Sequence, residues 1–465
     1  MNEISLPLGA IDAVIARMRR NGDLTAILWK GQEYSYSAFF EMIDAWQGRL
    51  NANSITRGSV CAVLSDYSPQ TCALFFALMR AGAILVPFTR SIEAEIPAFM
   101  EIAGVEFLFR FDERDRWTIT SFNNVPQADL VVSFREQNTP GLIVFTSGST
   151  GEPKGILHDV ERVMRKFAVE RPGWRTVLFL MMDHFGGFNT LLSTFAYGGV
   201  GLCIDVRSPE VVCKVIDQGR ATLLPTTPTF INLLVASGSY RGFDLSSIKL
   251  ITYGTEVMSE ATLQKVGTIF PNAQIKQTYG LSELGVLRSK SESDASVWVK
   301  VGGDGFETRI RDGILWVRSE ANMVGYLNAP NPFDSEGWMC TGDRVEVKGE
   351  YMRFLGRESE MINVGGQKVF PVEVENILLQ AENIREVTVY GVKHPLMGQT
   401  VQARVSLFQP EDPELLSERL RKFCLERLSR YKMPTRFVVV PQDEQHSERY
   451  KKIRFVDDKQ LGSKE

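Results

Sequence analysis

The sequence predicts an α/β protein with a large N-terminal domain of mostly parallel sheets layered with helices, followed by a small α+β domain. Three observations support this fold class. The chain has 465 residues, which is enough for more than one domain. Apolar strand-like runs alternate with helix-like segments up to about residue 280. Beyond about residue 300 the pattern changes to hairpins and a compact mixture of short strands and helices.

The alternation begins with a helix at 34–55, where Phe39, Ile43, Trp46 and Leu50 recur at helical spacing. Short apolar runs are typical of strands buried on both faces of a parallel sheet. Such strands are expected at 59–66, 84–88, 141–147, 175–181, 200–204, 221–227, 248–254 and 273–280. Helices are expected among them at 69–83, 160–170, 188–199 and 208–219. This order predicts βαβ units and parallel sheets covered by helices.

The C-terminal third of the chain has a different pattern of predicted strands and helices. Asp312-Gly313 predicts a β-hairpin over 306–319, and a strand is expected at 350–358. The last hundred residues form a unit of their own, with strands and helices expected at 369–380, 385–394, 401–408, 414–428 and 436–440. The boundary falls in the stretch GRESEM, which divides the chain into domains at 1–356 and 357–465.

Composition excludes several classes of protein. The net charge is −4, and no basic stripe with interleaved aromatics occurs, so no nucleic-acid partner is expected. None of the six cysteines forms a CxxC pair, which favours free thiols in a reducing compartment. The first twenty residues lack the pattern of a signal peptide, and the longest apolar stretch is interrupted by Arg80 and Gly82. We therefore expect a cytoplasmic protein without a membrane span; its oligomeric state cannot be inferred.

The stretch VFTSGSTGEPKG, residues 144–155, directly follows an apolar strand. Its glycines let a backbone wrap phosphate oxygens, its hydroxyls add short donors, and Lys154 adds a positive charge. The spacing does not fit the Walker pattern, so the alternative for this stretch alone is a flexible surface loop. The residues expected to contact phosphate are Thr146, Ser147, Gly148, Ser149, Thr150, Gly151 and Lys154.

This stretch resembles the phosphate loop of the adenylate-forming superfamily, which includes acyl-CoA synthetases, carrier-protein adenylation domains and firefly-type luciferases. Further motifs follow in family order: TYGTE at 252–256, TYGLSE at 278–283, GWMCTGD at 337–343, GRESEMINVGGQKVFPVEVE at 356–375 and ERYKKIRF at 448–455. The resemblance therefore spans nearly the whole chain. It implies that ATP and Mg²⁺ bind here, with CoA, or phosphopantetheine on a carrier protein, as the thiol.

The resemblance also implies residue roles. Tyr279 would stack near adenine, Ser282 would lie near the α-phosphate, and Glu283 would hold Mg²⁺, a cation that prefers oxygen ligands. Asp343 would bind the ribose hydroxyls, and Arg357 would donate to ribose or phosphate. The remaining nucleotide-binding positions implied by these motifs are Gly254, Thr255, Glu256, Thr278 and Gly280.

Lys452 aligns with the lysine of this superfamily that contacts the reacting carboxylate and α-phosphate. The usual preceding glycine is Lys451 here, so either lysine could serve; Ile453 favours Lys452. The small domain of the superfamily is mobile and rotates between the two half-reactions. The hinge position aligns with Ser359, a small residue that does not block such a rotation.

The acyl pocket is implied by DHFGGFNT at 183–190, with His184 at the gate position and a buried structural histidine as the alternative. Phe185 stands where relatives that activate amino acids carry an aspartate. An α-ammonium group would lack its partner there, so a fatty, aryl or other non-amino acid is favoured. The other residues implied to line the pocket are Tyr253, Thr255, Gly280 and Leu281.

The sequence thus predicts an AMP-forming acid–thiol ligase that makes an acyl-AMP and transfers the acyl group, with CoA as the favoured acceptor. No carrier domain follows residue 465, so we expect a standalone enzyme. Three alternatives stay open: loading of a separate carrier protein, a non-catalytic relative that binds a nucleotide or acyl ligand, and a light-emitting oxygenase. The sequence does not name the acid.

Overall fold

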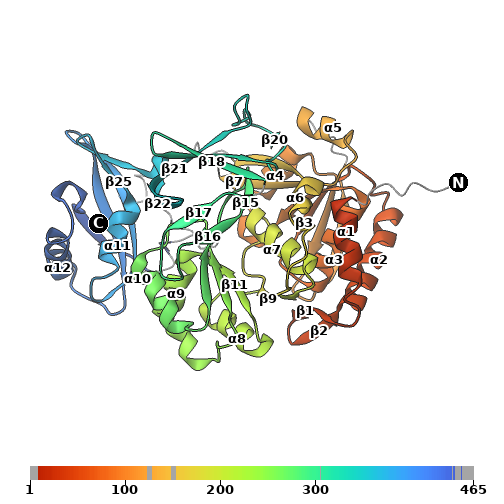
Figure 1. Ribbon diagram of the computed structural model, residues 1–465, viewed down its shortest axis with the longest axis horizontal. Helices are drawn as coiled ribbons and strands as arrows, with labels where there is room; N and C mark the ends of the chain where they lie inside the picture. Colours follow the sequence, from red (N-terminus) through yellow and green to blue (C-terminus); the bar gives the residue numbers. More distant parts are fainter. Residues whose placement is uncertain are drawn as a thin grey trace.

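The computed structural model describes residues 9–122, 128–147, 153–303, 305–441, 444–445 and 452. Within these ranges, two seven-stranded sheets and a six-stranded sheet make up the large domain, together with a two-stranded pair. A five-stranded sheet forms the small domain, which lies at one end of the molecule beside α9 (Pro228–Ser237) and α10 (Glu260–Ile269) (Figure 1). The predicted α/β fold class is confirmed.

One seven-stranded sheet has the order β13-β12-β11-β9-β10-β1-β2. Its strands pair in parallel from β13 to β1, and only β2 is antiparallel. The strands are β1 (Thr25–Trp29), β2 (Gln32–Ser35), β9 (Arg175–Val177), β10 (Val200–Leu202), β11 (Leu223–Thr226), β12 (Leu250–Tyr253) and β13 (Gln274–Gln277). Helices α8 (Pro209–Gly219), α9 and α10 contribute to the same core cluster as this sheet.

The other seven-stranded sheet has the order β20-β8-β7-β4-β3-β5-β6. Its centre is parallel, while β6, β8 and β20 pair antiparallel. The strands are β3 (Val60–Leu64), β4 (Ile84–Phe88), β5 (Phe107–Phe111), β6 (Trp117–Ser121), β7 (Gly141–Ser147), β8 (Pro153–Asp159) and β20 (Gly325–Tyr326). Helices α4 (Ile96–Ala103) and α5 (Asp129–Arg135) pack on one of its faces.

The remaining sheets are largely antiparallel. Tyr279–Leu281 (β14) pairs with Gly285–Leu287 (β15). The six-stranded sheet holds β16 (Ser289–Ser291), β17 (Val299–Val301), β18 (Phe306–Arg311), β19 (Ile314–Ser319), β21 (Met339–Lys348) and β22 (Tyr351–Arg357). The small domain holds β23 (Ile362–Val364), β24 (Gln367–Val369), α11 (Pro371–Leu378), β25 (Ile384–His394), β26 (Gly398–Leu407), α12 (Pro413–Leu425) and β27 (Arg436–Val439).

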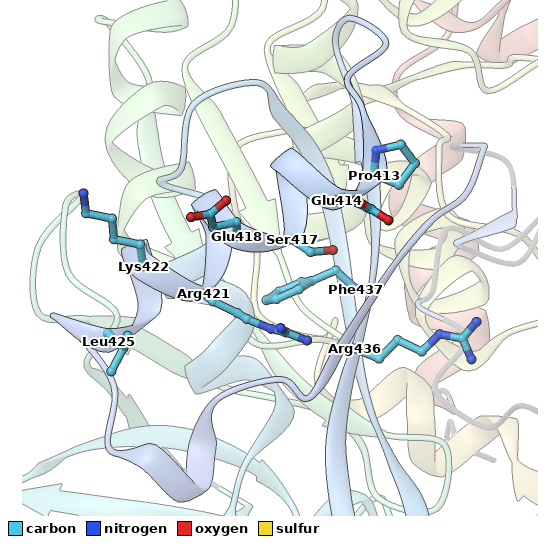
Figure 2. A pocket seen from close by; sticks show the side chains of 9 residues that line it. All are labelled: Pro413, Glu414, Ser417, Glu418, Arg421, Lys422, Leu425, Arg436 and Phe437. Carbon is cyan, nitrogen blue, oxygen red and sulfur yellow. The ribbon is translucent and has the colours of Figure 1, made fainter.

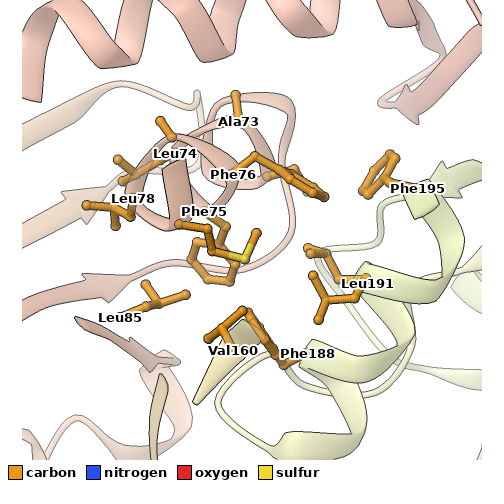
Figure 3. Packing of buried hydrophobic residues seen from close by; sticks show 14 of the residues in the cluster. Ala73, Leu74, Phe75, Phe76, Leu78, Leu85, Val160, Phe188, Leu191 and Phe195 are labelled. Carbon is orange, nitrogen blue, oxygen red and sulfur yellow. The ribbon is translucent and has the colours of Figure 1, made fainter. Parts of the chain in front are cut away.

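A layer of helices fills the space between the two seven-stranded sheets. It consists of α1 (Ala10–Arg19), α2 (Tyr36–Ala52), α3 (Pro69–Ala81), α6 (Val160–Arg165) and α7 (Phe185–Ala196). Figure 3 shows α3 facing α7 through their aromatic side chains. The ring centroids of Phe75 and Phe188 lie 6.3 Å apart, and those of Phe76 and Phe195 lie 5.8 Å apart. These contacts set the position of α7, whose first residues belong to the implied acyl pocket.

Several local predictions differ from the structure. The segment 153–159 was not predicted, yet it forms β8 and pairs antiparallel with β7, so the phosphate loop joins two strands of a hairpin. The hairpin of β1 and β2 was also missed. The strand expected at 175–181 is regular only over Arg175–Val177, and the helix expected at 160–170 ends at Arg165. Both missed hairpins join strands that are neighbours in the chain, and it is this pairing, which the apolar pattern alone does not reveal, that makes them strands.

No helix in the described part of the chain is long and apolar enough to cross a bilayer.

Gly187, in the first turn of α7, has no room for a side chain. A Cβ there would lie 1.9 Å from the carbonyl oxygen of Met181. We expect Gly187→Ala to lower the free energy of unfolding of the large domain by about 1–3 kcal/mol, the usual cost of overpacking. Urea unfolding followed by tryptophan fluorescence measures this cost.

Gly186→Ala is the matched control, since its added Cβ would be 3.6 Å from the nearest atom, Leu180 Cδ1. Alanine is the better helix former, so this variant should be at least as stable as the wild type. Equal stabilities of the two variants would contradict the expectation.

Candidate active site

Two adjacent parallel strands, β12 and β13, end at the implied adenine site. The backbone N–H of Thr278 donates to the carbonyl of Tyr253 at 2.7 Å, and its hydroxyl donates to the same oxygen at 3.0 Å. A Cβ on Gly254 would lie 2.6 Å from the Thr278 hydroxyl, so this position needs glycine. Thr255 then turns the chain away with a φ of +70°. Strand ends of this kind are where α/β folds bind ligands.

Asp343 lies beside these strand ends on β21. It pairs in register with Arg357 of β22, and the Nε of Arg357 lies 3.4 Å from Oδ1 of Asp343. The hydroxyl of Tyr279 donates to Oδ2 at 2.6 Å, and the Tyr279 ring stacks on Phe354 with centroids 4.6 Å apart. Burial raises the pKa of the Asp343 carboxyl, while Arg357 opposes that shift. The structure thus brings together three implied nucleotide-binding residues.

The base of the phosphate loop is an antiparallel ladder in which Thr146 is paired with Lys154. Residues 148–152 of the loop, and with them Gly148, Ser149, Thr150 and Gly151, lie outside the described residues, as does the side chain of Ser147. The Nζ of Lys154 lies 5.2 Å from the ring centroid of Tyr326 on β20.

Tyr326 also connects this loop to the implied metal ligand. Its hydroxyl donates to Oε1 of Glu283 at 2.7 Å, and burial together with this carboxylate raises the pKa of Tyr326. Within the described ranges, no cluster of three or more metal-ligating side chains occurs. A single oriented carboxylate such as Glu283 suits Mg²⁺, which is commonly held by one or two carboxylates together with substrate phosphates.

The implied acyl side of the site is built on α7 and β8. His184 precedes the first turn of α7, and Phe185 follows it into the buried layer. The Phe185 ring lies 4.6 Å from the ring of His158, centroid to centroid. The Nε2 of His158 lies 2.7 Å from the carbonyl oxygen of Ser282. Burial lowers the pKa of His158 to about 4, so this imidazole is neutral at pH 7.

The structure does not bring every implied pocket residue to this place. Tyr253 is fully buried in the core of the first sheet, with its hydroxyl 3.4 Å from Oε1 of Gln277. A Cβ on Gly280 would lie 2.7 Å from the carbonyl of Gly285, so the chain runs close to itself there. Leu281 and Ser282 keep some accessible surface.

Lys452 lies at the meeting point of the two domains. Its backbone N–H donates to Oε1 of Glu256 at 2.9 Å, although the two residues are 196 positions apart. Oε2 of Glu256 accepts from the hydroxyl of Thr229 at 2.6 Å. The Nζ of Lys452 lies 2.7 Å from Oε2 of Glu375 on α11, with side chains only 9% and 3% exposed. Lys451 lies outside the described residues.

Four residues of this region were missed by the sequence reasoning: His158, Lys166, Tyr326 and Glu375. Only His158 had a usable signal, since it follows Lys154 by four residues in an extended run. The others act through partners far away in the chain. Such partners cannot be read from local spacing.

A surface groove on the small domain lies away from these residues, on the outer side of α12 and β27 (Figure 2). Acidic and basic side chains both line it, and none was implied in nucleotide or acyl binding. The lining residues are Pro413, Glu414, Ser417, Glu418, Arg421, Lys422, Leu425, Arg436 and Phe437.

Comparison with known proteins agrees with this geometry. Residues 15–327 match the model of the AMP-binding enzyme family, and residues 373–458 match the AMP-binding enzyme C-terminal domain. The chain therefore belongs to the AMP-binding enzyme family, within the adenylate-forming superfamily that its motifs resemble.

Individual relatives are similar over nearly their full lengths. The chain is 26% identical to indoleacetate–CoA ligase of Aromatoleum aromaticum, covering 94% of this chain and 95% of that protein. It is 25% identical to the fatty acid–[acyl-carrier-protein] ligase MmaC of Mycobacterium marinum, covering 85% and 86%. The solved structure of the anthranilate CoA ligase AuaEII with anthranoyl-AMP has a TM-score of 0.76 at 19% identity, covering 95% of each chain.

Replacing the buried carboxyl of Asp343 is expected to stabilise the folded protein towards neutral pH and to weaken ATP binding. Its pKa is raised in the folded state, so its ionisation destabilises the folded protein as pH rises through that pKa. Asp343→Asn abolishes this titration. The stability of the variant relative to the wild type should therefore increase from pH 4 to pH 8, as measured by urea unfolding.

The same variant should bind ATP about 10- to 100-fold more weakly, the usual cost of losing hydrogen bonds to a charged group. Calorimetric titration with ATP measures this loss. A stability difference that does not change with pH, or unchanged ATP affinity, would contradict the assignment of Asp343.

Proposed function

We propose that this protein is an ATP-dependent carboxylic acid ligase that forms an acyl-AMP and then transfers the acyl group to the thiol of CoA. The observation that carries the proposal is the contact between Lys452 and Glu256. Through this contact Lys452, which we propose as the catalytic lysine, lies beside the residues that follow β12, where we propose that adenine binds. The family match supports the same class, an AMP-forming acid–thiol ligase.

In the first step, a carboxylate oxygen of the acid attacks the α-phosphorus of ATP and pyrophosphate leaves. Negative charge concentrates around the α-phosphate, so fixed donors and cations are the main contribution of the protein. We assign this role to Lys452 and to the hydroxyls and backbone of residues 146–154. Glu283 would hold Mg²⁺, which supplies charge neutralisation of the phosphates when bound, and Asp343 would accept from the ribose hydroxyls.

Lys452 must change partners for this step, because its amine is paired with Glu375 in the structure. Breaking a buried ion pair is costly because it leaves an uncompensated charge. The Lys452 amine therefore leaves Glu375 only when a negatively charged substrate becomes its new partner. ATP together with the reacting carboxylate offers that charge. Without substrate, the Lys452 amine stays paired with Glu375.

In the second step, the thiol sulfur attacks the acyl carbon and AMP leaves. We propose that the small domain turns for this step about Ser359, which is exposed in the short helical turn Glu358–Glu360 between β22 and β23. The domains would then be 1–356 and 357–465. CoA is the acceptor named for the indoleacetate ligase, whereas MmaC is named for a carrier protein, which remains the alternative acceptor.

The acid is proposed to lack an α-amino group. Phe185 packs between His158 and Gly285, and neither offers a charge for an ammonium group. The nearby Asp183 is buried and accepts from the hydroxyl of Thr89 at 2.8 Å, so it is already engaged. The names of the indoleacetate and anthranilate ligases favour an aryl acid among the non-amino acids.

The decisive experiment is acid-dependent ATP–pyrophosphate exchange over a panel of fatty, aryl and dicarboxylic acids. Lys452→Ala should lower the exchange rate by about 10²–10³-fold, the usual loss for one such transition-state contact. Lys451→Ala is the matched comparison and should retain most of the activity. A reversed order of the two variants would assign the role to Lys451.

Thioester formation from the active acid then separates the acceptors, with free CoA and a phosphopantetheine-loaded carrier protein assayed in parallel. Absence of exchange from folded protein that binds ATP would favour a non-catalytic nucleotide-binding relative. Oxygen consumption with light emission would favour the oxygenase alternative.

A further inference from the structure

A second amine, on a partly buried lysine, lies on the implied acyl side of the site. Lys166 follows the last residue of α6, and its Nζ donates to Oδ1 of Asn189 on α7. The same Nζ lies 5.0 Å from the ring centroid of Phe167 and 5.9 Å from that of Phe185. Phe185 also contacts His158, so this amine lies near an aromatic residue implied to line the acyl pocket.

The charge of Lys166 has no counter-charge among the described residues. No carboxylate there lies within ion-pair distance of its Nζ, whereas the amine of Lys452 is neutralised by Glu375. Burial lowers the pKa of Lys166 to about 7. An ammonium that loses part of its hydration without gaining a carboxylate partner is unfavourable, and a methionine of similar size would avoid that cost. An anionic ligand beside Lys166 would supply the missing negatively charged partner.

The facing side of α7 is polar. Gly186, Asn189 and Ser193 recur at helical spacing and keep accessible surface, while their apolar neighbours in α7 are buried. The amide nitrogen of Asn189 makes no hydrogen bond to any described residue, so its two N–H groups remain to donate. One ammonium and one amide that converge in this way match the acceptor oxygens of a carboxylate.

We propose that Lys166 and Asn189 bind a second carboxylate of the substrate, so that the preferred acid is a dicarboxylic acid. The proposal rests on the proposed function, because one carboxylate must react with ATP while the other pairs with Lys166. The apolar middle of the acid would lie along Phe185. Lys166 and Asn189 are therefore specificity-determining residues.

The test compares pairs of acids of equal length that differ only at the far end, which is a carboxylate in one and a methyl group in the other. Straight-chain pairs of four to ten carbons and a pair of phenyl-substituted acids are assayed by ATP–pyrophosphate exchange. The wild type should prefer the diacid of the best pair. Lys166→Met should lower kcat/KM for that diacid by about 10- to 100-fold, the range for losing a charged hydrogen-bond partner.

The same variant should leave kcat/KM for the matched monoacid unchanged or raised. Arg165→Met is the matched control, because Arg165 is the adjacent exposed cation and its loss changes the net charge equally. This control should keep the diacid preference, and so should Lys166→Arg. Circular dichroism checks that each variant is folded. If Lys166→Met does not fold, Asn189→Leu replaces it, with the same loss expected for the diacid.

Direct binding separates this inference from the proposed function. Calorimetric titration with the diacid alone should detect binding to the wild type and to Arg165→Met but not to Lys166→Met. No exchange with any acid, together with this binding difference, would overturn the proposed ligase activity while supporting the anion site. A wild type that uses or binds monoacids and diacids equally well, with no effect of Lys166→Met, would overturn the role of Lys166.

Discussion

The close packing of α3 against α7 between the two seven-stranded sheets is the constraint on which the rest of the molecule depends. Phe75 and Phe76 of α3 meet Phe188 and Phe195 of α7 in a layer without accessible surface. A dense apolar layer cannot slide without opening cavities. It therefore sets the distance between the hairpin that carries the phosphate loop and the strand ends that carry the implied adenine site.

Neutral hydroxyl donors orient the implied acidic residues of the site. Tyr279 donates to Asp343, Tyr326 donates to Glu283, and Thr229 donates to Glu256. A hydroxyl orients a carboxylate without cancelling its charge, whereas an ion pair would do both. Asp343 has both kinds of partner, a hydroxyl and a cation, because Arg357 also lies beside it. This arrangement leaves oxygen lone pairs for ribose, for a cation and for the small domain.

The amines of Lys452 and Lys166 differ in the partners that the protein gives them. Lys452 is paired with Glu375 and reaches the large domain through its backbone, so its side chain is held until a stronger anion is present. Lys166 has an amide for a partner instead of a carboxylate. The Lys452 amine is thus held by a carboxylate of its own domain, whereas the Lys166 amine has no carboxylate partner among the described residues.

The sequence by itself determined the alternating α/β pattern, the change of character after residue 300 and the order of the superfamily motifs. These features depend on local spacing, such as the recurrence of Phe39, Ile43 and Trp46, or the glycines around Lys154. Only the tertiary structure decided that 153–159 is a strand, that Tyr253 is buried in the core, and that Lys166 faces Asn189. Each of these depends on pairing or packing that local spacing does not reveal, because the partner strand or side chain is fixed only once the chain has folded.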